Sequence, residues 1–103
     1  MARSMMSRAC DISPSVRKAV KERDEYCVYC GSPHNLQIAH YISRGRGGLG
    51  VEQNLSVLCV NCHYALDNGA DSDLRRDIDR VMVENFKKHY PDWDKTKLVF
   101  TRW

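Results

Sequence analysis

Two short apolar stretches in the middle of the chain have the pattern of β-strands. Over residues 36–40, alternate side chains, among them Ile38 and His40, fall on one face of an extended backbone. A second apolar run at residues 55–58 predicts the return strand. The segment between them, residues 41–53, is rich in glycine and predicts a closed loop of the kind that usually carries function. Together these stretches predict an antiparallel hairpin.

Helical signals surround this hairpin. Ser13 is a good N-cap and Pro14 suits the first helical position, which predicts a helix over residues 13–26. Another helix is predicted over about residues 60–67, ended by an Asn-Gly pair that suits a left-handed cap. Apolar residues at helical spacing predict a longer helix that starts near residue 71 and ends near His89.

The two ends of the chain have weaker patterns. Residues 1–12 predict a loose arm, and residues 98–101 predict a last short strand. At 103 residues the chain is expected to be one domain, small enough for a structural metal to help its stability. The predicted fold class is α+β, with a core over residues 27–68 and a C-terminal helix and tail over residues 71–103.

The positive charge lies mainly in the first half of the chain. The net charge is +3, which permits a nucleic-acid partner without requiring one. Basic residues on the first predicted helix face water or phosphate, and the two arginines of the glycine-rich loop either contact phosphate or are simply solvated. The candidate phosphate contacts are Arg17, Lys18, Lys21 and Arg23 on the helix, and Arg44 and Arg46 on the loop.

The N-terminal ten residues lack the apolar core of a secretory signal, and no stretch approaches membrane-spanning length. A cytoplasmic location is therefore expected, which would be the host cytoplasm for a phage-encoded protein. Paired cysteines in a reducing compartment favour metal binding over a disulfide.

Cysteines flank the predicted hairpin in two Cys-x-x-Cys pairs. In each pair the spacing lets both thiolates converge on one ion, which is typical of a tetrahedral structural zinc site. A redox dithiol and simple buried thiols are the alternatives. The expected zinc ligands are Cys27, Cys30, Cys59 and Cys62, while the remaining cysteine, Cys10, is expected to have no role.

Polar residues that the zinc site does not need suggest a second function. His63 and Asp67 are four residues apart, so they share one helix face and could hold another divalent ion with open positions for water and phosphate. His40 ends the first strand, and an imidazole with a pKa near 6.5 suits proton abstraction from water. A base beside a Lewis acid predicts hydrolysis of a phosphodiester.

The stretch from Cys27 to Asp67 resembles the HNH endonucleases, through the pattern CxxCG, LxIAHYxxRxxGG and NLxxLCxxCH. The resemblance implies a ββα-metal fold in which His40 is the general base, Asn54 braces the loop and His63 binds a divalent ion. It also implies a double-stranded DNA substrate, cut one strand per site to leave a 5′-phosphate. The sequence of residues 41–48 is similar to that of phage-encoded stand-alone members, which implies phage packaging proteins as candidate partners.

One position departs from the HNH pattern. Many members have an Asp or His ligand immediately before the first His, where this chain has Ala39. The resemblance then leaves His63 and Asp67 as the protein ligands, with Gln37 as a weaker candidate, so activity is expected to need added Mg²⁺, Mn²⁺, Ni²⁺ or Zn²⁺.

A non-catalytic zinc ribbon that binds nucleic acid or a protein partner is the competing function. It explains the cysteine pairs and the basic residues in the N-terminal part of the chain. It gives no reason for His40, Asn54 and His63 to occur together.

Overall fold

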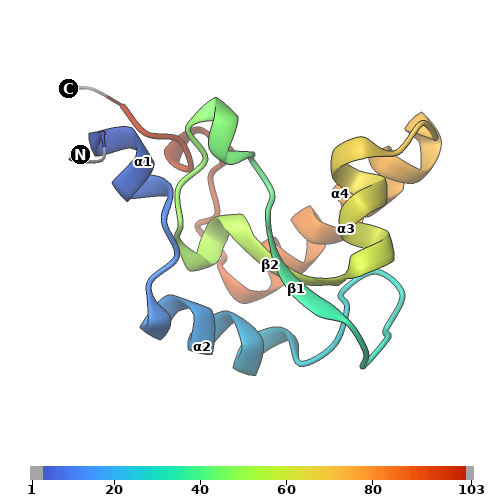
Figure 1. The fold of residues 1–103 in the computed structure, drawn as a ribbon. Helices are drawn as coiled ribbons and strands as arrows, with labels where there is room; N and C mark the ends of the chain where they lie inside the picture. Colours follow the sequence, from blue (N-terminus) through green and yellow to red (C-terminus); the bar gives the residue numbers. More distant parts are fainter. Residues whose placement is uncertain (1–3, 102–103) are drawn as a thin grey trace.

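A computed structural model of the chain describes residues 4–101. Its centre is an antiparallel hairpin of β1 (Leu36–His40) and β2 (Leu55–Cys59), in which Leu36 faces Cys59 and His40 faces Leu55. The helix α3 (Val60–Asn68) follows β2 without a loop, so the hairpin and the helix form one ββα unit (Figure 1). The α+β fold class predicted from the sequence is confirmed.

Helices cover both faces of the hairpin, which is why all residues of β2 are buried. On one face, Ala39 and Leu58 pack against the apolar stripe of α4 (Ser72–His89), where Phe86 is fully buried. On the other face, Val20 of α2 (Pro14–Asp24) packs against Leu55 and Val57 of β2. A strand buried on both sides needs a continuous apolar run instead of alternation, and LSVLC comes close to one.

The helix α2 begins as its sequence predicts, with the Ser13 side chain accepting from the Val16 N–H at 3.2 Å. One of its basic residues was expected in water or on phosphate and is buried instead. The Arg23 side chain is 8% exposed; it pairs with Asp24 at 2.7 Å and donates to the Leu55 carbonyl at 2.6 Å. Arg23 therefore joins α2 to the start of β2 and is not available to DNA.

The expected loose arm at the N-terminus is wrong for part of its length, because residues 5–10 form the helix α1 (Met5–Cys10). A helix this short is marginal by itself, so its contacts with the rest of the protein matter. The Gly50 N–H donates to the Ala9 carbonyl at 3.0 Å, and Cys10 is only 1% exposed. Figure 1 shows α1 beside the loop that joins the two strands.

That loop contains two short 3-10 turns, η1 (Arg44–Arg46) and η2 (Glu52–Asn54), although its glycine content predicted no regular structure. The chain after α4 runs back along this loop through a third turn, η3 (Lys95–Lys97). The strand expected at residues 98–101 is reduced to one bridge between Val99 and Gly48. Too few partners align there for a second ladder.

The connection after α3 also differs from its prediction. Gly69 has φ −69°, which is extended backbone and not the left-handed cap expected of an Asn-Gly pair. Within residues 4–101, no helix has both the length and the hydrophobicity of a membrane span.

Candidate active site

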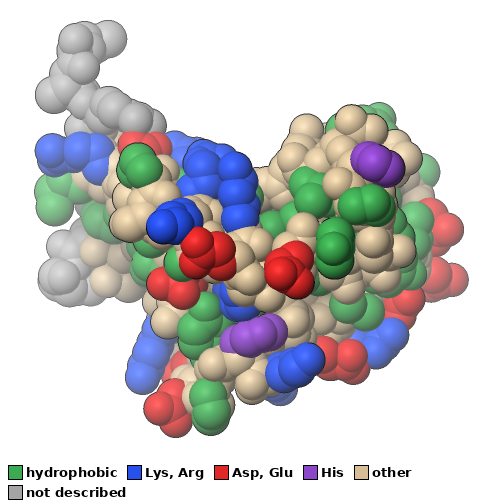
Figure 2. Space-filling model, turned by 90° about the horizontal axis from the view of Figure 1, so that it is seen from below, with side chains coloured by type: hydrophobic (Ala, Val, Ile, Leu, Met, Phe, Trp, Pro, Cys, Tyr) green, Lys and Arg blue, Asp and Glu red, His purple; other side chains and the backbone are tan. Residues whose placement is uncertain are grey.

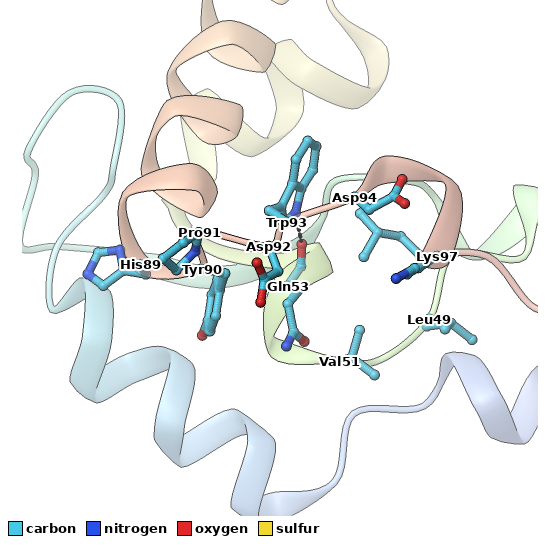
Figure 3. A pocket seen from close by; sticks show the side chains of 11 residues that line it. Leu49, Val51, Gln53, His89, Tyr90, Pro91, Asp92, Trp93, Asp94 and Lys97 are labelled. Atoms are coloured by element: carbon cyan, nitrogen blue, oxygen red, sulfur yellow. Dashed lines mark hydrogen bonds between the residues drawn. The ribbon is translucent and has the colours of Figure 1, made fainter.

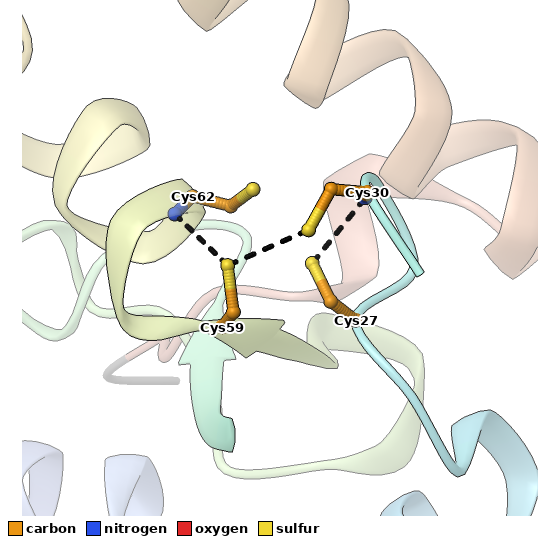
Figure 4. Close-up of side chains that lie close together, drawn as sticks. All are labelled: Cys27, Cys30, Cys59 and Cys62. Carbon is orange, nitrogen blue, oxygen red and sulfur yellow. Dashed lines mark hydrogen bonds between the residues drawn. The ribbon is translucent and has the colours of Figure 1, made fainter. Parts of the chain in front are cut away.

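The ends of the hairpin bring all members of the predicted zinc set together. Cys27 and Cys30 lie in the turn before β1, while Cys59 ends β2 and Cys62 lies in the first turn of α3. The four Sγ atoms all lie within 4.8 Å of one another, and those of Cys30 and Cys59 are 3.6 Å apart. Figure 4 shows the four side chains pointing toward a common centre. A tetrahedral ion with Zn–S bonds of about 2.3 Å needs sulfur atoms about 3.8 Å apart, so the cluster fits zinc.

The four thiols influence one another's ionisation. Burial and contacts with the other cysteines raise the pKa of the Cys62 thiol. Burial also raises the pKa of Cys27, but N–H groups of the two cysteine turns outweigh it and lower that pKa to about 7. Several thiolates at this spacing repel one another unless a cation neutralises them. The cluster is therefore suited to a structural zinc that holds the start of the hairpin to α3.

His40 lies at the end of β1, half-buried, with its Nε2 2.9 Å from the Cys10 carbonyl oxygen. Burial lowers the pKa of His40 below its ordinary value of 6.5, and the nearby Arg44 guanidinium lowers it further. His40 is therefore neutral near pH 7. A carbonyl can only accept a hydrogen bond, so Nε2 carries the proton and Nδ1 keeps the lone pair of a base.

Asn54 is fully buried, and its side chain connects the two ends of the loop over residues 41–53. Its Oδ1 accepts from the Ile42 N–H at 2.8 Å, and its Nδ2 donates to the carbonyls of Ile42 and Leu49 at 3.1 and 2.9 Å. A buried amide with this many partners fixes the loop that follows His40. This is the geometry expected of a loop brace.

His63 lies between two oxygen acceptors. Its Nε2 is 3.0 Å from Asp67 Oδ2, and its Nδ1 is 2.7 Å from Gln37 Oε1. Two ligand atoms that bind one ion at right angles, each at about 2.1 Å, are about 3.0 Å apart, so His63 and Asp67 fit a shared divalent ion. Gln37 contacts the ring from the other side, which is the position of a group that orients a metal-binding histidine.

Ala39 lies on the side of β1 that faces the hydrophobic core. It is fully buried against Leu58 and the apolar stripe of α4. The position where many HNH proteins have a metal ligand is here part of the hydrophobic core.

A cleft of about 500 Å³ has both candidate functional groups on its wall. His40 lies there together with His63 and Asp67, so the structure brings the candidate base and the candidate metal pair to one solvent-accessible space. Ile12 and Ile38 supply apolar wall beside them.

Basic residues lie in two neighbouring clefts. One, of about 360 Å³, is lined by Arg17 and Lys21 and shares Ile38 with the cleft of His40. The other, of about 290 Å³, shares Asp67 and is lined by three basic residues, Arg46, Arg75 and Lys95. Arg75 and Lys95 were missed from sequence, because only the fold brings α4 and η3 beside the loop. On the face drawn in Figure 2, basic side chains are interspersed with acidic ones, so this face has no continuous positive surface.

Arg44, like Arg23, was expected to reach phosphate and has partners within the protein. Its guanidinium donates to the Cys10 carbonyl and to the Asp11 carboxylate, each at 2.8 Å. The structure therefore places Arg44 on the N-terminal segment.

A further hollow of about 460 Å³ lies between the loop and the chain after α4 (Figure 3). Trp93 lies within it and donates to the Gln53 carbonyl at 2.7 Å. None of the cysteines, His40 or His63 lines this hollow, so it is not the candidate active site.

Comparison with known proteins agrees with this geometry. Residues 27–69 match the family model described as HNH endonuclease. The HNH resemblance is confirmed. The HNH segment, as we call residues 27–69, contains the cysteine cluster, His40, Asn54, His63 and Asp67, whereas Arg17 and Lys21 precede it.

Among solved structures, the chain is similar to the Type IV phosphorothioation-dependent restriction endonuclease ScoMcrA, with 24% sequence identity and a TM-score of 0.64. The similarity covers 85% of this chain but only 22% of that protein, so the chain spans about a fifth of its length. At this identity the likeness shows a shared fold, including elements outside the HNH segment. No curated protein matches the sequence. The family match supports a nuclease in general terms.

Proposed function

We propose that this protein is a divalent-metal-dependent DNA endonuclease that hydrolyses phosphodiester bonds. The observation that carries the proposal is the shared cleft, which combines a neutral His40 with the His63–Asp67 pair. The match of the HNH segment supports the same reaction class.

His40 would begin the reaction by accepting a proton from water at Nδ1. The water oxygen forms a bond to phosphorus, the bond from phosphorus to the 3′ oxygen breaks, and that oxygen takes up a proton from solvent. The products are a 3′-hydroxyl and a 5′-phosphate. Asn54 would keep the loop, and with it His40, in position through its bonds to Ile42 and Leu49.

His63 and Asp67 would hold the divalent ion, with Gln37 fixing the His63 ring. When bound, such an ion supplies positive charge to the phosphate and to the departing oxygen. Since these two residues leave most coordination positions open, affinity for the ion is expected to be low without DNA.

Double-stranded DNA is the proposed substrate. The clefts lined by Arg17 and Lys21 on one side and by Arg46, Arg75 and Lys95 on the other adjoin the cleft of His40. Basic residues in such positions bind the phosphates that flank the cut one, without reading sequence.

The second candidate function is a zinc module that binds nucleic acid without cutting it. The burial of Ala39 favours it, because a core alanine replaces a usual metal ligand. Catalysis is favoured because His40 and His63 line one cleft and Asn54 braces the loop that follows His40.

Cleavage of supercoiled plasmid separates the two functions. With Mg²⁺, Mn²⁺, Ni²⁺ or Zn²⁺ added in turn, the nuclease proposal expects nicked or linear product that EDTA abolishes. Binding of plasmid without cleavage in all four metals would favour the non-catalytic module.

A further inference from the structure

The helix α1 lies outside the HNH segment, yet its last residue contacts the candidate base. We propose that the C-terminal end of α1 is a positioning element of the active site: the Cys10 carbonyl holds the His40 ring so that Nδ1 faces the reaction as the basic nitrogen. This inference rests on the nuclease function proposed above.

The loop over residues 41–53 holds the C-terminal end of α1 at two neighbouring carbonyls, those of Cys10 and Ala9. Arg44 Nη1 donates to the same oxygen that His40 Nε2 contacts, at 2.8 and 2.9 Å respectively. Beside it, the Gly50 N–H donates to the Ala9 carbonyl at 3.0 Å. A carbonyl oxygen has two lone pairs, and here Arg44 and His40 use both. Arg44 therefore holds the Cys10 carbonyl oxygen in place, and the Gly50 N–H holds the neighbouring residue of α1.

This contact does more in the reaction than hold the ring still. While His40 is neutral, its Nε2–H donates an ordinary hydrogen bond to Cys10. Once Nδ1 takes a proton from water the ring is a cation, and the same hydrogen bond becomes charge-assisted and stronger. The carbonyl therefore stabilises the charged form that develops as the reaction proceeds. Burial lowers the pKa of His40, and the Cys10 carbonyl acts against that lowering.

Arg44 consequently acts on His40 through the Cys10 carbonyl at the end of α1. By binding both the Cys10 carbonyl and the Asp11 carboxylate, it joins the loop after His40 to the segment after α1. It is a second positioning residue, which gives the N-terminal segment a catalytic purpose that its sequence does not reveal.

Gly50 offers a substitution aimed at this carbonyl. A Cβ at Gly50 would lie 2.0 Å from the Asp11 carbonyl oxygen and 2.9 Å from that of Cys10, so Gly50→Ala must displace the segment that contacts His40. Gly45→Ala is the matched control for the NMR readout, because it adds the same methyl group to the same loop and meets nothing nearer than 4.0 Å. Gly45 lines the cleft of His40, so this variant is not a control for cleavage. Neither glycine has a positive φ, so alanine can adopt the backbone dihedral angles at both positions, and the two variants differ in the space around the added methyl group.

The readout is ¹⁵N NMR of the histidine side chains in the 103-residue chain carrying its zinc. In the wild type and in Gly45→Ala, we expect His40 to carry its proton on Nε2 and to exchange it slowly with water. In Gly50→Ala, exchange of that proton should accelerate about tenfold, as expected for the loss of one hydrogen bond. The cleavage rate at saturating plasmid should fall by roughly tenfold or more while the half-saturating plasmid concentration stays the same.

Arg44→Gln tests the same contact without added volume and decides the matter if Gly50→Ala does not fold. It should accelerate the exchange in the same direction. A proton on Nδ1 in the wild type, or a protected Nε2 proton in every folded variant, would overturn the positioning role. The NMR readout needs no DNA, so the two proposals fail separately: a wild type that cuts no plasmid overturns the nuclease function instead.

Discussion

The cysteine cluster and the His63–Asp67 pair are two candidate metal sites that meet at adjacent residues of α3, Cys62 and His63, and they differ in almost every property. The cluster has four sulfur ligands within 4.8 Å, drawn from both ends of the hairpin. The pair has two ligand atoms 3.0 Å apart on side chains that are 24% and 46% exposed, in a cleft of about 500 Å³. A complete, closed ligand set can only hold the fold together, while an incomplete and open one leaves positions for water and phosphate.

Loss of a cluster ligand should have the largest effect. Cys59→Ser removes one thiolate from the site that joins β2 to α3, and structural zinc contributes about 10–16 kcal/mol, as much as the whole stability of a small domain. We expect no cooperative thermal unfolding transition and less than one zinc per chain. Cys10→Ser, a cysteine outside the cluster, should retain one zinc. A folded Cys59→Ser protein would contradict the structural role of the cluster.

Loss of the base should abolish activity while the fold persists. His40→Ala removes the group that takes the proton from water, so plasmid cleavage should fall by about 10²–10⁴-fold. The melting temperature should stay close to that of the wild type. His34→Ala, a change to an exposed histidine of the turn before β1, should cleave normally. Equal cleavage by both variants would remove His40 from the mechanism.

The pH dependence of cleavage tests the state of His40. Burial, followed by the nearby Arg44, lowers the pKa of His40 below 6.5, so the ring stays neutral and basic until the pH falls under that value. The rate measured from about pH 5 to pH 8 should rise with pH and have its midpoint below the ordinary pKa of histidine. A midpoint above pH 6.5 would mean that His40 is not the group that titrates.

Loss of one open-site ligand should weaken metal use without harming the fold. Asp67→Asn keeps the size of the side chain but removes its charge, and we expect the metal concentration for half-maximal cleavage to rise about tenfold or more. Asp73→Asn, at an exposed carboxylate in the first turn of α4, should leave it unchanged. Equal values for both variants would exclude Asp67 as a ligand.

The smallest effect is expected from the basic clefts. Replacing Arg17 or Lys21 with alanine removes one phosphate contact, which should weaken plasmid binding modestly and reduce its salt dependence by about one unit of slope. Lys87→Ala, on α4 and outside the three clefts, serves as the control. A salt slope identical in all three variants would remove this surface from the DNA path.

The same contrast explains what the sequence could predict. Cys-x-x-Cys pairs and the hairpin depend on neighbours in the chain, so the zinc cluster and both strands could be predicted at nearly their true bounds. The contacts of His40 with Cys10 and of His63 with Gln37 join residues 30 and 26 positions apart, which no local pattern encodes. Arg23 shows the same limit, because its helical position looks exposed until β2 packs over it.

The most direct test of two metal sites with separate tasks is mild EDTA treatment of the 103-residue chain, with zinc content, thermal unfolding and plasmid cleavage measured on the same sample. The open pair should lose its ion and the closed cluster should keep its zinc. We therefore predict one zinc per chain, an unchanged melting temperature, and no cleavage until a divalent ion is added back. Cleavage that continues with one zinc per chain, or that disappears only when the protein unfolds, would contradict the separation of the two sites.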